Sequence, residues 1–246
     1  MNKFLFLGVT LFLAIGIVFA LPSQANDNSD RGPLEKIDFI HYKKNSGNGK
    51  PSESGNAKPS GTTCYNFLGN GAKWKVTEPY IINPTNSQGL SESLIVNTTN
   101  ASVSAWENQV SFNVFGTQFV NTGYGYNNGT LDGQNTLSFG NVAETDVIGV
   151  TTIWGYFSGA PKTRQIVEWD MLLDENEYAW GDATIDPSKM DLQNIITHEL
   201  GHSAGLGDLY QTDCIQQTMY GYSSEGETSK RTLGTGDVAG IKKLYG

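Results

Sequence analysis

The chain has 246 residues, of which 38% are hydrophobic and 17% are charged, and its formal net charge at pH 7 is −9. This length accommodates one folded domain with an additional segment, whereas two full domains would be unusually small. The acidic balance argues against a nucleic-acid-binding protein, because such proteins present a basic surface. The two cysteines, Cys64 and Cys214, are too few for a disulfide-rich miniprotein or a four-cysteine zinc module.

The N-terminus has the pattern of a targeting segment. Lys3 precedes an apolar run over residues 4–21, and the small residues Ser23 and Ala25 follow it. This pattern predicts a secretory signal peptide over residues 1–25, and therefore a secreted or cell-surface protein. The alternative is an uncleaved N-terminal membrane anchor, because the run reaches the lower limit of length for spanning a bilayer.

Residues 26–61 are expected to be a pro-segment or a flexible linker. Residues 43–61 contain no large apolar side chain and consist mainly of Gly, Ser, Lys, Asn and Pro, so little there can offset the entropy of ordering. Residues 37–42 (IDFIHY) are the one apolar patch. A disordered spacer is the favoured interpretation of this patch, and a short pro-segment strand or a docking element is the alternative.

The folded domain is expected over residues 62–246. Periodicity predicts a strand near a sheet edge, then a helix, then three strands, with a loop before the last two strands. The strands are expected at residues 74–82, 110–114, 147–156 and 166–173, the helix at 90–106 and the loop at 123–133. Strands with one helix, followed by a more helical second half, indicate the α+β class.

The chemistry is concentrated in residues 191–209, which read DLQNIITHELGHSAGLGDL. Asp191 can cap a helix, and His198 and His202 are then four residues apart. On a helix this spacing places two imidazoles on one face, where they can share a metal ion, and Glu199 beside them can accept a proton from a water molecule.

A third metal ligand is expected from the turn that follows this helix. Gly205 can end the helix in a left-handed conformation and turn the chain back. Asp208 would then supply a carboxylate oxygen to zinc and leave one position open for water, as a catalytic site requires. Asp213 is a second carboxylate nearby that could substitute for it.

The stretch HELGHSAGLGD resembles the signature HExxHxxGxxH of the metzincin zinc peptidases, with Asp208 in place of the third histidine, as in snapalysin-type members. TMYGYSS around Met219 looks like the Met-turn, and residues 235–246 (TGDVAGIKKLYG) are similar to the C-terminal helix of matrixins. Lys73 and Trp74 before a strand, and a helix that closes on Trp106, also fit the matrixin catalytic domain. In these respects the chain resembles secreted matrixin-like proteins of prokaryotes, archaea included.

This resemblance implies a twisted mixed β-sheet with an active-site helix and a C-terminal helix. It implies one catalytic zinc ion, held by His198, His202 and Asp208, with Glu199 as general base and acid. Met219 would lie beneath the metal as an apolar floor without binding it. Tyr220 and Tyr222 would wall the pocket for the substrate side chain, which would favour apolar residues after the scissile bond.

The sequence also departs from the family in two ways. Outside the motif only His41 remains, so the second, structural zinc of animal matrixins is not expected. The latency sequence PRCGxPD is absent as well, although Cys64 could still reach the zinc as a blocking thiolate. We favour a disulfide between Cys64 and Cys214, because an even pair in an exported chain usually bridges.

Asp170 and Asp174 belong to an acidic cluster that could bind calcium, although a solvated turn is the favoured interpretation. The expected partners are protein or peptide substrates, with no nucleic acid and no membrane beyond the signal peptide or N-terminal anchor. We expect a monomer.

These features predict a secreted zinc endopeptidase. Two alternatives stay open: a zinc-binding surface or adhesion domain without proteolytic activity, and a zinc amidase that acts on cell-wall peptides. The intact Glu199 argues against the first alternative, but the same zinc and base would serve the second.

Overall fold

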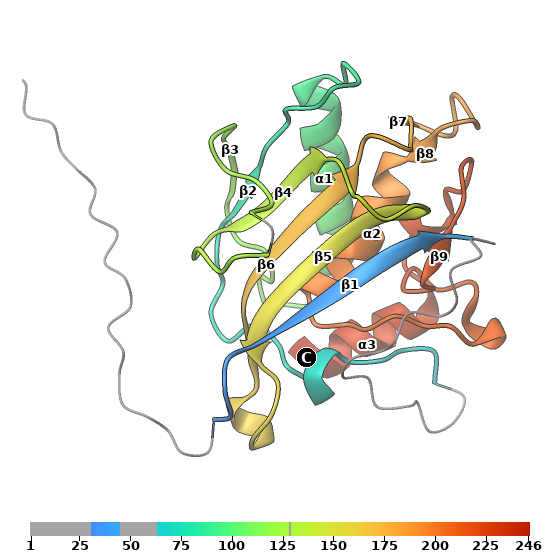
Figure 1. Cartoon of the computed structure of the whole chain (residues 1–246). Helices are drawn as coiled ribbons and strands as arrows, with labels where there is room; N and C mark the ends of the chain where they lie inside the picture. Colours follow the sequence, from blue (N-terminus) through green and yellow to red (C-terminus); the bar gives the residue numbers. More distant parts are fainter. Residues whose placement is uncertain (1–30, 45–62, 128) are drawn as a thin grey trace, which may run out of the picture.

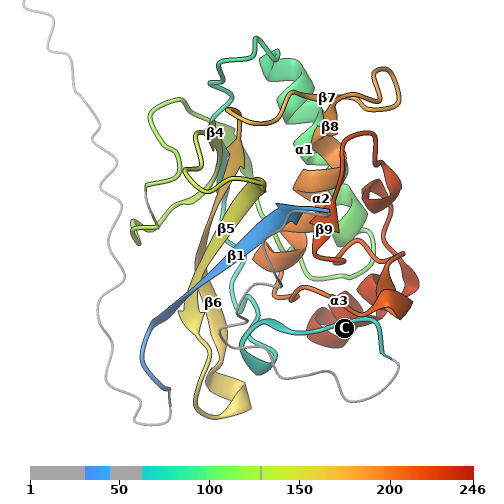
Figure 2. The ribbon, with the colours of Figure 1, turned by 45° about the vertical axis from the view of Figure 1, so that its right-hand side comes forward.

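The computed structural model describes residues 31–44, 63–127 and 129–246 (Figure 1). The expected signal peptide and most of the expected linker lie outside these described residues. The described part has the expected α+β fold, in which a mixed β-sheet carries the three α-helices on one face (Figure 2).

The strands and helices follow one another along the whole described chain. The strands are β1 (Glu35–Lys43), β2 (Tyr80–Ile82), β3 (Gln118–Val120), β4 (Asn135–Gly140), β5 (Val147–Tyr156), β6 (Gln165–Asp174), β7 (Trp180–Gly181), β8 (Met190–Asp191) and β9 (Tyr222–Ser223). The helices are α1 (Glu92–Glu107), α2 (Leu192–Ser203) and α3 (Thr235–Tyr245), with short 3-10 helices η1 (Leu68–Asn70), η2 (Pro161–Thr163), η3 (Thr212–Cys214) and η4 (Ser229–Arg231). No described helix is long and apolar enough to cross a membrane.

The main sheet has seven strands in the order β3-β2-β4-β6-β5-β1-β9. Strands β3, β2, β4 and β6 are parallel to one another, whereas β5 runs antiparallel to β6 and to β1. Strand β1 also pairs in parallel with β9. The first strand of the described chain therefore lies between two elements that are far away in sequence, as Figure 1 shows.

Both faces of the sheet are covered. On one face, Ile153 of β5 and Met171 of β6 are fully buried in the core together with Ile195 and Leu200 of α2. The loop residues 121–127 lie over the other face, where Tyr126 forms a hydrogen bond with Thr152 of β5 at 3.0 Å. Burial on both faces explains why β5 and β6 are near-continuous apolar runs that could be recognised from the sequence.

Helix α2 begins where the sequence indicates. The Asp191 side chain accepts a hydrogen bond from the backbone N–H of Asn194 at 2.8 Å, which satisfies one of the N–H groups left free at a helix N-terminus. The Asp191 carboxylate also forms an ion pair with Arg231 of η4. The start of the helix is therefore fixed to the segment that precedes α3.

One expected strand is shorter than predicted and another is absent. Only the last three residues of the stretch 74–82 form a strand, β2, which lies near the sheet edge as expected, next to the edge strand β3. Residues 110–114 form no strand, because the Glu107 carboxylate accepts the backbone N–H groups of Val114 and Phe115, which are then unavailable to a strand partner.

Six of the nine described strands, namely β1, β3, β4, β7, β8 and β9, are not among the four strands expected in the folded domain. Strand β4 follows the expected loop directly, and β1 contains the patch at residues 37–42. A disordered spacer is therefore the wrong interpretation of that patch.

Cys64 and Cys214 form the expected disulfide, with their Cα atoms 5.3 Å apart. The bridge connects the start of the domain to η3, across 150 positions of sequence. The segment that carries Cys64 is thus covalently attached beside the loop that follows α2.

Candidate metal centre

Helix α2 buries the two histidines of the motif. His198 and His202 are 0% and 1% exposed. The helix is held against α1 by Trp106, whose indole N–H donates to the carbonyl of Thr197 at 2.8 Å. The imidazoles therefore sit on a rigid element inside the protein, as a preorganised site requires.

Backbone carbonyls fix the orientation of both rings. Nδ1 of His198 lies 2.7 Å from the carbonyl oxygen of Thr218, and Nδ1 of His202 lies 3.0 Å from that of Leu206. A carbonyl only accepts, so each Nδ1 carries the proton and each Nε2 presents a lone pair. These two Nε2 atoms are 3.2 Å apart and face each other.

The turn after α2 brings Asp208 to the same point. Gly205 has a φ of +102°, and a Cβ added there would lie 2.6 Å from the carbonyl oxygen of Ala72, so the expected left-handed glycine is required. Oδ1 of Asp208 lies 3.2 Å from Nε2 of His198 and 3.4 Å from Nε2 of His202. Its other oxygen accepts a hydrogen bond from the Tyr210 hydroxyl at 3.1 Å.

These three side chains fit a cation. Oδ1 of Asp208 is buried and has no hydrogen-bond partner, and it faces two nitrogen lone pairs. Three acceptors that converge without a donor are unfavourable unless a positive ion lies between them. Two neutral imidazoles and one carboxylate are a ligand set of zinc, and the ligand atoms lie within 4.8 Å of one another.

Burial and the contacts among the three residues shift their pKa values in different directions. Burial acts to lower the pKa of His202, but the adjacent Asp208 outweighs it and raises that pKa. Burial lowers the pKa of His198 to about 4, which keeps its imidazole neutral and able to bind a metal. Burial acts to raise the pKa of Asp208, but the adjacent His202 and His198 outweigh it and hold that pKa well below its usual range. The carboxylate is therefore ionised in its buried position.

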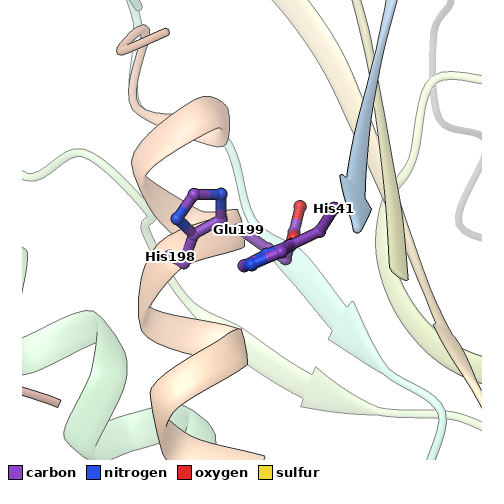
Figure 3. Close-up of side chains that lie close together, drawn as sticks. All are labelled: His41, His198 and Glu199. Atoms are coloured by element: carbon purple, nitrogen blue, oxygen red, sulfur yellow. The ribbon is translucent and has the colours of Figure 1, made fainter. Parts of the chain in front are cut away.

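Glu199 points away from these three ligands toward the sheet. Its side chain is fully buried, and burial raises the pKa of its carboxyl. Oε2 accepts a hydrogen bond from the Thr151 hydroxyl of β5 at 2.5 Å, and Oε1 lies 2.9 Å from Nδ1 of His41 (Figure 3). Both carboxylate oxygens thus have a protein partner.

His41 is the residue of the site that the sequence analysis did not assign. It comes from β1, is 2% exposed, and its ring lies 4.0 Å from the ring of His198. Its Nε2 is 3.0 Å from the Ser223 hydroxyl of β9. Burial lowers the pKa of His41 to about 3, so the ring is neutral and its Nδ1–H donates to Glu199. The only signal in the sequence was one histidine inside the patch at residues 37–42.

Met219 is buried and packs against the helix that carries the two histidines. It is 1% exposed, and its sulfur packs against Gly201, the residue just before His202. A Cβ on Gly201 would overlap this sulfur and would lie 2.7 Å from Cζ2 of Trp106. Residue 201 therefore has to be glycine for α2 to pack against both Met219 and Trp106.

The remaining candidate residues are distributed as follows. Tyr220 and Tyr222, whose ring centroids are 5.9 Å apart, line a cavity of about 350 Å³ to which His198, His202, Asp208 and Glu199 do not contribute. Asp213 is exposed in η3, so Asp208 rather than Asp213 joins the histidines.

Asp170 and Asp174 do not form a cation site in the described part of the chain. Asp174 accepts the backbone N–H groups of Val142 and Glu177, and Asp170 accepts from the Thr136 hydroxyl. Neither residue belongs to a described group of three possible metal ligands.

This site has the features of a zinc metallopeptidase. They are a buried helix with two facing imidazoles, a carboxylate that a glycine turn brings back to them, and a methionine packed against the helix. The matrixin family model matches residues 73–246, and the chain therefore belongs to the matrixin family. It is also similar to Metalloendoproteinase 1 of Glycine max, with 42% identity over 77 residues. This match covers 30% of the chain and 24% of the soybean protein, so the chain spans about a quarter of that relative's length.

Proposed function

We propose that this protein is a secreted zinc-dependent endopeptidase, in which His198, His202 and Asp208 hold one zinc ion and Glu199 is the general base. The observation that carries the proposal is the convergence of the two Nε2 lone pairs and the partnerless Oδ1 of Asp208. Membership of the matrixin family supports the same reaction class.

The chemistry is divided between the metal and the protein. Zinc, when bound, lowers the pKa of a water molecule toward about 7 and polarises the scissile carbonyl. Glu199 accepts a proton from the water molecule while the oxygen of that water adds to the carbonyl carbon. It then delivers that proton to the amine nitrogen as the C–N bond breaks. Thr151, at 2.5 Å from Oε2, holds the Glu199 carboxylate in place during both transfers.

Tyr220 and Tyr222 are proposed to bind the substrate side chain that follows the scissile bond. They line a cavity of about 350 Å³, and their rings supply apolar surface to it. The Tyr222 ring also packs against that of Tyr210, which donates to Asp208. This contact connects the wall of the pocket to a metal ligand.

Secretion is supported by the Cys64–Cys214 disulfide, because such bonds persist in oxidising compartments. We propose that the signal peptide at residues 1–25 directs this export. The partners are then extracellular protein or peptide substrates.

The test compares the wild-type chain with Glu199→Ala. Native mass spectrometry counts the zinc bound to each protein, and hydrolysis is measured with quenched casein as substrate. Because β1 covers the site, hydrolysis is measured both on the intact chain and on the chain cut within residues 45–62. One zinc in both proteins, with chelator-sensitive hydrolysis by the wild type alone, is the expected result. Zinc in both proteins with hydrolysis by neither would contradict the peptidase function and favour a binding domain. Hydrolysis of cell-wall peptides but not casein would favour an amidase.

A further inference from the structure

The segment at residues 64–68 lies along the loop that connects α2 to the third proposed zinc ligand. The backbone N–H of Leu68 donates to the carbonyl of Gly205 at 2.9 Å, and the N–H of Gly207 donates to the carbonyl of Asn66 at 3.0 Å. Leu68 is fully buried, and Asn66 is 9% exposed. The segment is therefore packed against this loop and bonded to its backbone at two places.

The same loop determines the positions of two of the three proposed zinc ligands. Leu206 lies between the two bonded residues of the loop and forms an isolated antiparallel bridge with Phe67. The carbonyl oxygen of Leu206 accepts from Nδ1 of His202 at 3.0 Å, which orients that ring. Asp208 follows in the same loop, and its Oδ1 faces the Nε2 atoms of both histidines. A displacement of the loop would therefore move Asp208 and release the ring of His202.

The Cys64–Cys214 disulfide fixes the start of the segment beside the far end of this loop. Cys214 lies in η3, which follows the loop, and is 4% exposed. Cys64 also approaches α3 closely, since a Cβ added at Gly236 would overlap the Cys64 carbonyl oxygen. Downstream of the segment, the indole N–H of Trp74 donates to a carbonyl at the end of α2 at 2.8 Å. The disulfide thus holds the end of the segment that Trp74 does not hold.

The pairing of the segment with the loop depends on this covalent anchor. A backbone hydrogen bond adds little net stability, because the groups of a separated segment bond to water instead. Ordering the segment also costs backbone entropy at every residue. A disulfide removes much of that entropy before the segment packs. Without the bond between Cys64 and Cys214, residues 64–68 would therefore separate more readily from the loop that carries Asp208.

We propose that zinc binding by His198, His202 and Asp208 is coupled to the Cys64–Cys214 disulfide, so that the protein holds its metal tightly only in an oxidising compartment. This inference rests on the proposed zinc site and on the proposed export. Oxidation transfers two electrons and two protons from the two thiols to a small-molecule disulfide, which becomes two thiols, while the bond between the two sulfur atoms forms. The loop is then preorganised for the metal, as a tight site requires.

Such a coupling acts in both directions. If the disulfide raises the affinity for zinc by a given factor, zinc stabilises the disulfide against reduction by the same factor. A tenfold factor corresponds to about 30 mV in the reduction potential of this two-electron couple. Zinc affinity and reduction potential therefore report the same quantity independently, and neither depends on hydrolysis.

The first experiment measures the zinc dissociation constant of the full chain by competition with a chromophoric chelator, at a temperature at which circular dichroism shows each variant to be folded. The double variant Cys64→Ser and Cys214→Ser should bind zinc at least tenfold more weakly than the oxidised wild type. The matched control is Leu137→Ala in β4, which pairs with β2 and β6. It removes a fully buried side chain and lowers stability, but its zinc affinity should stay within about twofold of the wild type.

The second experiment uses the wild type and requires no folded variant. The oxidised fraction is measured by alkylation and mass spectrometry in glutathione buffers, with and without free zinc at a concentration that a metal buffer fixes and that saturates both forms. Zinc should lower the reduction potential by at least about 30 mV. The shift should disappear in His202→Ala, which lacks a zinc ligand. Zinc bound by the free thiols of the reduced chain would raise the potential instead, and would contradict the proposal.

Equal dissociation constants for the oxidised wild type and the double serine variant, or a potential that zinc does not lower, would overturn the coupling and leave the proposed metal centre intact. An oxidised wild type that binds no zinc would overturn the metal centre and the coupling together. Coupled zinc binding by a chain that hydrolyses no peptide would support the coupling and overturn the peptidase function.

Discussion

The Asp237 carboxylate accepts a hydrogen bond from the backbone N–H of Met219 at 3.2 Å, and so connects the C-terminal helix to the turn beneath the metal centre. It also accepts the N–H groups of Thr218 and Gly234, and it is fully buried. Thr218 is the residue whose carbonyl accepts from His198. The orientation of a proposed zinc ligand therefore depends on a carboxylate of α3.

Asp237→Ala should destabilise the protein and weaken zinc binding. The substitution leaves three N–H groups without their acceptor, which costs about 2–4 kcal/mol of the free energy of unfolding. Urea denaturation and zinc titration measure the two effects. Asp213→Ala, at an exposed aspartate, is the control and should change neither quantity. Unchanged stability in Asp237→Ala would contradict the role assigned to this carboxylate.

Gly201→Ala should also destabilise the protein, although alanine is the better helix former. A Cβ at this position meets the sulfur of Met219 and Cζ2 of Trp106, and such overpacking costs about 1–3 kcal/mol. Gly240→Ala in α3 is a milder comparison, because its Cβ would meet only side-chain carbons of Leu206 and Tyr65, at 3.0 Å. Thermal unfolding of the two variants should rank Gly201→Ala as clearly less stable. The reverse order would show that Met219 does not require this glycine.

Asp208→Ala should lower the affinity for zinc at least a hundredfold, because only two imidazoles would remain as protein ligands. Asp208→His restores a third ligand and should recover part of that affinity. Competition with a chromophoric chelator measures the dissociation constants. Asp213→Ala is expected to bind zinc like the wild type, and a loss of zinc there instead of in Asp208→Ala would reassign the third ligand.

The buried Asp170 predicts a pH dependence of stability. Burial raises the pKa of its carboxyl to about 7, and its Oδ2 has no hydrogen-bond partner. The folded state therefore binds the proton more tightly than the unfolded chain, whose aspartate titrates near 4. Its contribution to stability is fully present below pH 4 and is lost as the pH rises to about 7.

Asp170→Asn should remove this loss and stabilise the protein at pH 8 by about 2–4 kcal/mol, as measured by urea denaturation at pH 5 and pH 8. Asp174→Asn is the contrasting variant, because Asp174 accepts two backbone N–H groups and should lose stability at both pH values. Equal slopes of stability against pH for the wild type and Asp170→Asn would show that Asp170 is ionised in the folded protein.

Replacing both Cys64 and Cys214 with serine should lower the free energy of unfolding by about 3–5 kcal/mol. The bridge closes a loop of 150 positions, and its removal restores freedom to the unfolded chain. Denaturation of the wild type with and without a reductant provides the same comparison without a mutation. A difference below about 1 kcal/mol would contradict this estimate.

Much of the domain could be predicted because its signals are local. The strands β5 and β6 are long apolar runs, and α2 combines an Asp cap, an apolar stripe and the spaced histidines. The turn at Gly205 could be predicted because a glycine adopts a positive φ easily. Asp208 was then the carboxylate placed to serve as the third ligand that zinc requires.

The missed features depend on partners that are distant in sequence. Strand β1 is a short apolar patch beside a segment rich in Gly, Ser and Lys, and its partner β5 lies more than 100 positions away. His41 could therefore not be placed against Glu199 from the sequence. Residues 110–114 alternate like a strand, but the Glu107 carboxylate captures the N–H groups of the residues at their end.

X-ray absorption at the zinc K-edge of the zinc-loaded chain tests the central claim most directly. Two imidazole nitrogens at about 2.0–2.1 Å and oxygen ligands at about 2.0–2.2 Å are expected in the wild type. The spectrum of Asp208→Ala should lose an oxygen ligand, and that of His41→Ala should keep both imidazoles. A sulfur ligand, a third imidazole that disappears in His41→Ala, or a wild-type spectrum without two imidazoles would contradict the site formed by His198, His202 and Asp208.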